Sequence, residues 1–208
     1  MQVRDGSSGT PSPAASARRA QIIAAAIEVL AELGYGQTSF AKIAKRAGIS
    51  STRLISYHFA GKDELIQAVA EEAMGAAVAF MQPRIRAASG HWERVAVYIT
   101  ANLEFMRDRP SHIRSIVEIA NNARTEDGRP YALEGPVSAV SLLEQEFREG
   151  QRDGAYLDFD PLVMARTLRA AIDNAALQHS LDPELDLDSY AAELVRLFGR
   201  AIRKDTTS

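Results

Sequence analysis

The sequence contains no cysteine, which excludes disulfide bonds and thiol chemistry and fits a reducing compartment. Long apolar runs are also missing, because the longest, residues 73–81, is far shorter than the roughly 20 residues of a membrane-spanning helix. Residues 1–16 are rich in Ser, Gly, Pro and Ala and lack the apolar segment of a signal peptide, so they predict a disordered leader. We therefore expect a soluble, cytoplasmic protein with no membrane partner.

Signatures of catalysis are absent as well. The four histidines form no close metal-ligand spacing, and the chain has no P-loop, nucleophile-elbow or dinucleotide-binding glycine motif. Carboxylates such as Glu144, Glu146 and Glu149 are more typical of solvated faces than of a paired acid–base site. We expect no enzyme, no cofactor and no bound metal.

Charge is distributed unevenly along the chain, although the net charge is only −3. Residues 18–62 hold seven Lys and Arg against two Glu, whereas residues 63–208 hold sixteen basic against twenty-four acidic residues. A small basic module followed by a larger acidic part indicates that the first part alone meets a polyanion. Chance asymmetry is the alternative explanation.

Helical periodicity runs through almost the whole chain. Apolar residues recur at three- and four-residue spacing between 17 and 33, which predicts an amphipathic helix that ends at Gly34. Two short helices should follow, the first capped by Thr38 or Ser39 and stopped by Gly48, the second running from a cap at Ser50 or Ser51 to about Phe59. Short helices joined by a tight glycine turn form a helix-turn-helix.

The rest of the chain predicts six more helices and an all-α fold. Helix breakers fall where the periodicity is interrupted, and the expected spans are 62–82, 91–108, 110–123, 131–150, 161–180 and 188–203. The predicted organisation is a leader over 1–16, a helix-turn-helix domain over 17–62, and a larger helical domain over 63–208.

The second helix of the helix-turn-helix has a polar outer face. With Leu54, Ile55 and Phe59 turned inward, the side chains left outward can meet base edges in a major groove: Ser51, Thr52, Arg53, Ser56 and Tyr57. Lys62 begins the next helix, where its ammonium group and free backbone N–H groups can hold a phosphate.

These residues resemble the TetR family of bacterial transcriptional repressors. The similarity covers about fifty residues and includes the segments GYGQTSFAKIAKRAGIS (34–50), YHF (57–59) and GKDEL (61–65). It implies an all-α homodimer with a three-helix DNA-binding domain and a helical ligand-binding and dimerisation domain. The DNA-contacting residues that it implies, together with the outward face, are Thr38, Ser39, Ser50, Ser51, Thr52, Arg53, Ser56, Tyr57, His58 and Lys62.

Two features differ from the common family pattern. One extra residue lies between Gly48 and Phe59, which leaves the register of the reading helix open, and Ser56 stands where many members have an aromatic residue. Tyr57 could contact phosphate or pack inward, and His58 could contact phosphate or cap the helix locally.

The larger domain offers a candidate ligand pocket in which polar groups lie among apolar neighbours. Apolar walls with a few polar groups are typical of small-molecule sites, although such residues also form ordinary cores. The candidates are Trp92, Tyr98, Asn102, Phe105, Met106, Ile116, Asn121 and Asn174.

The last two helices carry small and large apolar residues at helical spacing, a pattern suited to close helix pairing. In the TetR family this pair joins its symmetry mate, so we expect it to form the dimer interface, with intramolecular packing as the alternative. The candidates are Leu162, Ala165, Leu168, Ile172, Ala176, Tyr190, Leu194, Leu197 and Phe198.

The sequence thus predicts a one-component regulator that binds inverted-repeat operator DNA as a homodimer, represses, and is released by a small molecule. Three alternatives stay open: a ligand-independent regulator that acts through a protein partner, an activator on the same scaffold, and a helical small-molecule enzyme.

Overall fold

The structure is a computed structural model that describes residues 12–124 and 138–204. Over these residues the chain is all-helical, as predicted, and Tyr156 forms an isolated bridge pairing with Arg203. In the described ranges no helix is long and apolar enough to cross a membrane. The helices are α1 (Pro13–Leu33), α2 (Phe40–Arg46), α3 (Thr52–His58), α4 (Lys62–Ala87), α5 (His91–Asp108), α6 (Pro110–Asn122), α7 (Ala139–Arg152), α8 (Pro161–Leu181) and α9 (Leu187–Ile202).

Helix α1 begins four residues earlier than the periodicity predicts. The Ser12 side chain accepts a hydrogen bond from the Ala15 N–H at 3.2 Å, and Pro13 occupies the first turn, where its missing N–H costs nothing. Residues 13–16 of the predicted leader therefore belong to α1, and its residues 1–11 lie outside the described residues. Residues 131–137, the start of the helix predicted over 131–150, also lie outside the described residues.

Helix α4 continues through Pro83, where the sequence predicts its end. Proline inside a helix has no N–H for the carbonyl four residues earlier, here that of Ala79, and its ring crowds that carbonyl. The Arg84 guanidinium donates to the next carbonyl along the chain, that of Phe80, at 2.5 Å and lies over the Phe80 ring. Because the exposed side of the helix can tolerate the ring of Pro83, the helix extends to Ala87.

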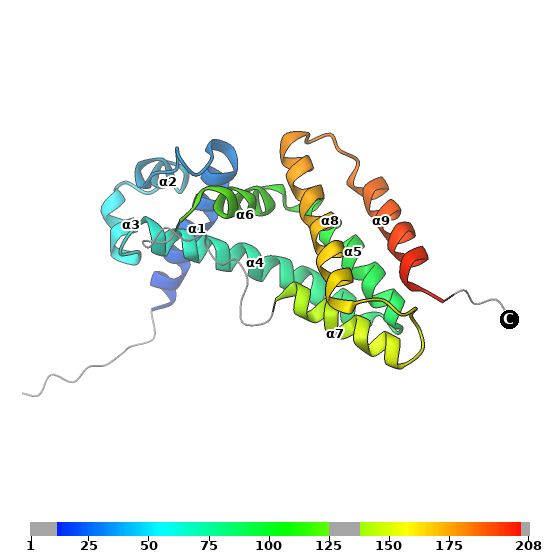
Figure 1. Ribbon diagram of the computed structural model, residues 1–208. Helices are drawn as coiled ribbons and strands as arrows, with labels where there is room; N and C mark the ends of the chain where they lie inside the picture. Colours follow the sequence, from blue (N-terminus) through cyan, green and yellow to red (C-terminus); the bar gives the residue numbers. More distant parts are fainter. Residues whose placement is uncertain (1–11, 125–137, 205–208) are drawn as a thin grey trace, which may run out of the picture.

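Two groups of helices make up the molecule (Figure 1). We call α1–α3 the head and α5, α7, α8 and α9 the body; α4 and α6 run between them. The head core is almost entirely aliphatic, and it is completed by Ile119 and Ala123 from α6. The body core is richer in aromatic rings, with Phe147 edge-on to Tyr156 and Phe159 at 6.1 and 5.7 Å.

Candidate nucleic-acid interface

Two serine caps and one glycine set where α2 and α3 begin and how they are joined. The Ser39 hydroxyl accepts from the Lys42 N–H at 3.4 Å, and the Ser51 hydroxyl accepts from the Arg53 N–H at 3.1 Å. Gly48 takes φ +65° between them, a backbone conformation that glycine adopts without a steric penalty. These contacts fix where the reading helix α3 starts, and they select Ser39 and Ser51 from the alternative caps of the sequence analysis.

Buried side chains set the rotation of the two helices. Ile43 and Ala44 of α2 and Ile55 of α3 are buried, as is Phe59 directly after α3. The Gln21 side-chain amide also donates to the Ala47 carbonyl at 2.6 Å, tying the end of α2 to α1. The inward positions of Ile55 and Phe59 agree with the periodicity of the sequence.

The opposite face of α3 is open to solvent and polar. Thr52, Arg53, Ser56 and Tyr57 are exposed, and 79% of the Tyr57 surface is accessible, so this ring points outward and does not join the core. Within the part of the chain that the structure describes, the Arg53 guanidinium has no hydrogen-bond partner. An outward helix with free donors suits a major groove.

The other predicted contact residues on the head differ in their availability. Ser39, Ser50 and Ser51 are exposed. His58 is half-buried, with its ring edge-on to Tyr57 at 5.1 Å. Thr38 requires a correction, because it is 6% exposed and its hydroxyl donates to the Gly34 carbonyl at 2.8 Å. A buried hydroxyl that closes its own turn has no access to DNA.

Lys62, which the sequence predicts to hold a phosphate, has contacts within the head. Its ammonium donates to the Tyr35 carbonyl at 3.1 Å and lies 4.0 Å from the centre of the Tyr35 ring, while burial lowers its pKa. Asp63 and Glu64 occupy the first turn of α4, and negative charge at this position opposes a phosphate. The structure therefore places Lys62 against the α1–α2 turn and not on an open anion site.

Two exposed lysines of α2 were not among the predicted contact residues. They are Lys42, whose ammonium donates to the Gln37 side-chain oxygen at 3.4 Å, and Lys45. In a helix-turn-helix the first helix crosses the DNA backbone while the second lies in the groove. Arg46, in contrast, is occupied by ion pairs with Glu28, at 2.9 Å, and Glu32. The positive charge of residues 18–62 was the available signal, but it did not tell free from paired groups.

Comparison with known proteins identifies this architecture. Residues 22–69 match the family described as "Bacterial regulatory proteins, tetR family". The chain is 31% identical over 173 residues to the HTH-type transcriptional activator FasR of Mycolicibacterium smegmatis, a match that covers 83% of this chain and 77% of that protein. The chain belongs to the TetR family. It is therefore a DNA-binding transcriptional regulator and not an enzyme.

Two further comparisons find proteins that this chain resembles in sequence or in fold. It is 34% identical over 86 residues to the fatty acid metabolism regulator protein of Bacillus subtilis. The match covers 41% of this chain, and it spans less than half, 44%, of that relative. The solved structure of the fatty acid degradation regulator FadR from Bacillus halodurans aligns with a TM-score of 0.71 at 22% identity and covers 86% of this chain and 96% of that one. At this identity the alignment shows a shared fold.

The eight residues predicted to bind a ligand in this TetR-family body do not share one site. Phe105 and Met106 are buried core residues. Trp92 packs on α9 so closely that a Cβ on Gly199 would lie 2.9 Å from its ring. Asn121 and Asn174 are exposed, and Ile116 is half-buried on α6.

Tyr98 and Asn102, by contrast, are brought together by a residue that the sequence analysis missed. The Arg169 guanidinium of α8 donates to the Tyr98 hydroxyl at 2.9 Å and to the Asn102 side-chain oxygen at 3.3 Å, and it pairs with Asp173. Asn102 also donates to the Tyr98 carbonyl at 2.7 Å. Arg169 lies 67 residues beyond Asn102, so only the tertiary fold places it there.

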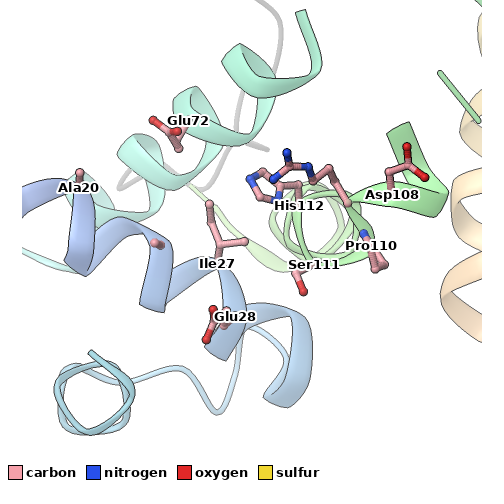
Figure 2. Close-up of a pocket in the computed structure, with 10 residues that line it drawn as sticks. Ala20, Ile27, Glu28, Glu72, Asp108, Pro110, Ser111 and His112 are labelled. Carbon is pink, nitrogen blue, oxygen red and sulfur yellow. The ribbon is translucent and has the colours of Figure 1, made fainter. Parts of the chain in front are cut away.

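A cavity lies at the junction of the head with the rest of the molecule (Figure 2). Its volume is about 310 Å³, and none of the eight predicted ligand residues lines it. Figure 2 shows Ile27 of α1 between Glu72 of α4 and His112 of α6. Burial, together with the nearby charge of Arg109, lowers the pKa of His112.

The residues predicted for the dimer interface divide into two faces. Ala165, Leu168, Ile172, Ala176, Leu194 and Phe198 are buried within the single protomer. Leu162 and Tyr190 are half-buried, and Leu197 is 61% exposed. Helices α8 and α9 are apolar on more than one side, so periodicity alone did not tell the inner face from the outer one. The exposed apolar side chains of α8 and α9 therefore lie mainly at positions next to the predicted ones.

Proposed function

We propose that this TetR-family protein is a cytoplasmic repressor that binds an inverted-repeat operator as a homodimer and is released by a small molecule. The single observation that carries the DNA-reading part is the exposed polar face of α3, where Thr52, Arg53, Ser56 and Tyr57 project from a capped and buried scaffold. Arg53 supplies the bidentate donor that most often reads guanine, while Lys42 and Lys45 hold the flanking phosphates.

An apolar stripe on α8 and α9 supports the homodimer. Val163, Leu177 and Leu181 of α8 are 59%, 41% and 74% exposed, and Leu197 of α9 is 61% exposed. Val163 and Leu177 are fourteen residues apart, so they lie on one side of α8. A second copy of the stripe, related by a two-fold axis, covers these side chains and presents two α3 helices to successive major grooves.

The polar cluster of Tyr98, Asn102 and Arg169 is the proposed contact region for the effector. A largely buried guanidinium between α5 and α8 favours a molecule with an acidic or hydrogen-bond-accepting group, because such a group replaces its present partners. The B. subtilis relative is named as a regulator of fatty acid metabolism, and a carboxylic acid with an apolar chain fits this chemistry.

Release from DNA follows from a population shift. An effector that binds better when the two heads are wrongly spaced lowers operator affinity by its preference between the two states. A compound that binds both states equally changes nothing, however tightly it binds.

Activation is a second candidate, favoured by one observation. The M. smegmatis relative is named a transcriptional activator. The same dimer can activate if its operator lies upstream of the promoter instead of overlapping it, so the sign of regulation depends on where the operator lies.

The test is selection of bound duplexes from a random library by the purified full chain at moderate salt, followed by sequencing. Enrichment of an inverted repeat with half-sites roughly one or one and a half helical turns apart supports the dimeric reading. No enrichment from folded protein free of copurified ligand refutes it. A medium-chain carboxylic acid is then titrated into the complex, and unchanged affinity at saturation favours a regulator that acts through a protein partner.

A further inference from the structure

Glu118 of α6, the helix that runs between head and body, forms a hydrogen bond to the head. One of its carboxylate oxygens accepts from the Tyr35 backbone N–H at 2.8 Å and from the Asn122 side-chain amide at 3.2 Å. Over residues 12–124 and 138–204, this bond to Tyr35 is the one hydrogen bond that joins helices α1–α3 and their turns to helices α5–α9. Tyr35 lies in the turn that leads into α2.

The same turn is held from its other side by α4. Lys62 donates to the Tyr35 carbonyl at 3.1 Å, so the amide and the carbonyl of one residue bind two different helices. Gly34 fits this arrangement because it has φ +76° and because a Cβ there would lie 3.2 Å from the Glu118 carboxylate. The turn is therefore built to admit the carboxylate at short range.

Helix α6 is well placed to carry a displacement to this turn. Its Ile119 is fully buried in the head core, whereas Ile113 and Val117 pack on the body core. The first turn of α6 lines the cavity at the junction, through Ser111 and His112. A rigid helix seated in both cores cannot shift in the body without moving its contacts in the head.

We infer that Glu118 is a positioning residue for DNA reading: its carboxylate sets the α1–α2 turn and thereby the orientation of α2 and α3 relative to the body. This inference rests on the proposed function, since it assumes that operator affinity depends on how the two heads are oriented. Loss of the carboxylate leaves the Tyr35 N–H without its acceptor, and of the two side chains outside the head that hold Tyr35 only Lys62 remains.

The experiment compares Glu118→Ala with Glu118→Gln and with the control Asn121→Ala, which changes an exposed residue of the same helix. Two quantities are measured on the full chain: hydrogen exchange of the Tyr35 amide without DNA, and affinity for the selected operator. In Glu118→Ala we expect exchange to rise and affinity to fall by about tenfold, a factor typical of couplings between sites. Glu118→Gln keeps an acceptor oxygen and should recover most of both losses, and Asn121→Ala should match the parent.

The two readouts separate this inference from the proposed function. If no duplex is enriched by the parent protein, the proposed function fails, while Tyr35 exchange still tests the hydrogen bond. Unchanged exchange in Glu118→Ala overturns the inference, and so does faster exchange with unchanged operator affinity. Equal losses in the Ala and Gln variants also overturn it, because they indicate a general loss of helix stability.

Discussion

The head and the body differ in how far their buried polar groups have hydrogen-bond partners. In the head the buried hydroxyl of Thr38 has its partner, and the remaining core side chains are almost all aliphatic. In the body, the Tyr156 hydroxyl and the His179 Nδ1 are buried with no hydrogen-bond partner among the residues that the structure describes, and the half-buried Arg169 guanidinium donates to the Asn102 side chain. Burial also raises the pKa of Tyr156.

This difference matches the work that each part does. The head interior is a tightly packed apolar scaffold, and the DNA-reading surface that we propose is the outer face of α3. A buried polar group without a hydrogen bond costs free energy unless another molecule supplies the bond. The interior of the body is therefore the part suited to exchange hydrogen-bond partners with a ligand. Helix α6 joins the two and belongs to both.

The largest expected effect tests whether α6 belongs to the head core. Ile119→Ala removes a side chain with 0% exposure and should destabilise the protein by about 2–5 kcal/mol through lost burial and a cavity. Chemical denaturation followed by circular dichroism measures this loss. Ile116→Ala, at a half-buried position of the same helix, is the control. Equal costs for both would show that the head core does not depend on Ile119.

The next largest effect tests whether base-reading and phosphate-contacting side chains on the head are different residues. Arg53→Ala should cost about 1–3 kcal/mol on the preferred duplex and relax base preference at one position. Lys45→Ala should weaken binding to all duplexes alike and reduce the salt slope by about one. Duplex selection and salt titration of each variant decide this. Identical behaviour of the two would contradict the separation into reading and positioning side chains.

A smaller effect is expected at the turn that connects head and body. Gly34→Ala places a Cβ on a residue with φ +76° and near the Glu118 carboxylate, and should cost about 1–2 kcal/mol for the backbone alone. Gly36→Ala meets no atom within 4 Å and should be nearly neutral. Thermal unfolding compares them, and a neutral Gly34→Ala would mean that the turn relaxes freely.

The smallest effect concerns a pH-dependent contact confined to the body. The His91 ring lies 2.7 Å from Glu146 and 2.8 Å from Asp153. Burial lowers the His91 pKa, but hydrogen bonds to Asp153 and Glu146 outweigh it, so the pKa is raised. Since folding favours the proton, this stabilisation is fully present below the unfolded pKa of about 6.5 and is lost as pH rises through the folded value.

We expect the contribution of His91 to stay under about 1 kcal/mol, because one partner is exposed. Denaturation midpoints of the parent and of His91→Gln, measured between pH 5.5 and 8.5, should converge as the pH rises. A constant gap across that range would show that His91 does not titrate in this contact.

Much of the fold follows from local patterns in the sequence. The spans predicted for α5, α6, α8 and α9 agree with the structure to within one residue, because Gly90, Pro110 and Pro161 mark the starts of α5, α6 and α8. Pro83 misled the prediction, since an exposed proline with a neighbouring arginine donor is compatible with a continuous helix. The outward face of α3 was also predictable, because Ile55 and Phe59 fix its rotation.

Contacts between distant segments could not be predicted in this way. Whether Lys62 meets a phosphate or the Tyr35 carbonyl depends on a turn 27 residues earlier. The partners of Arg46 and Arg169 likewise come from other helices or from tertiary packing. On α8, Leu168 and Leu177 look alike in the sequence, yet one is buried and the other is 41% exposed.

Helix α6 packs in the head core and against the body core, and this restricts where residues can be inserted or deleted. Each added residue turns the following part of a helix by about 100°. One insertion between Val117 and Ile119 would rotate Ile119 out of the head core while Val117 stayed against the body. Tolerated insertions and deletions should therefore fall in the connections outside α6. Related chains that differ in sequence and in loop length should keep the spacing between the core residues of this helix.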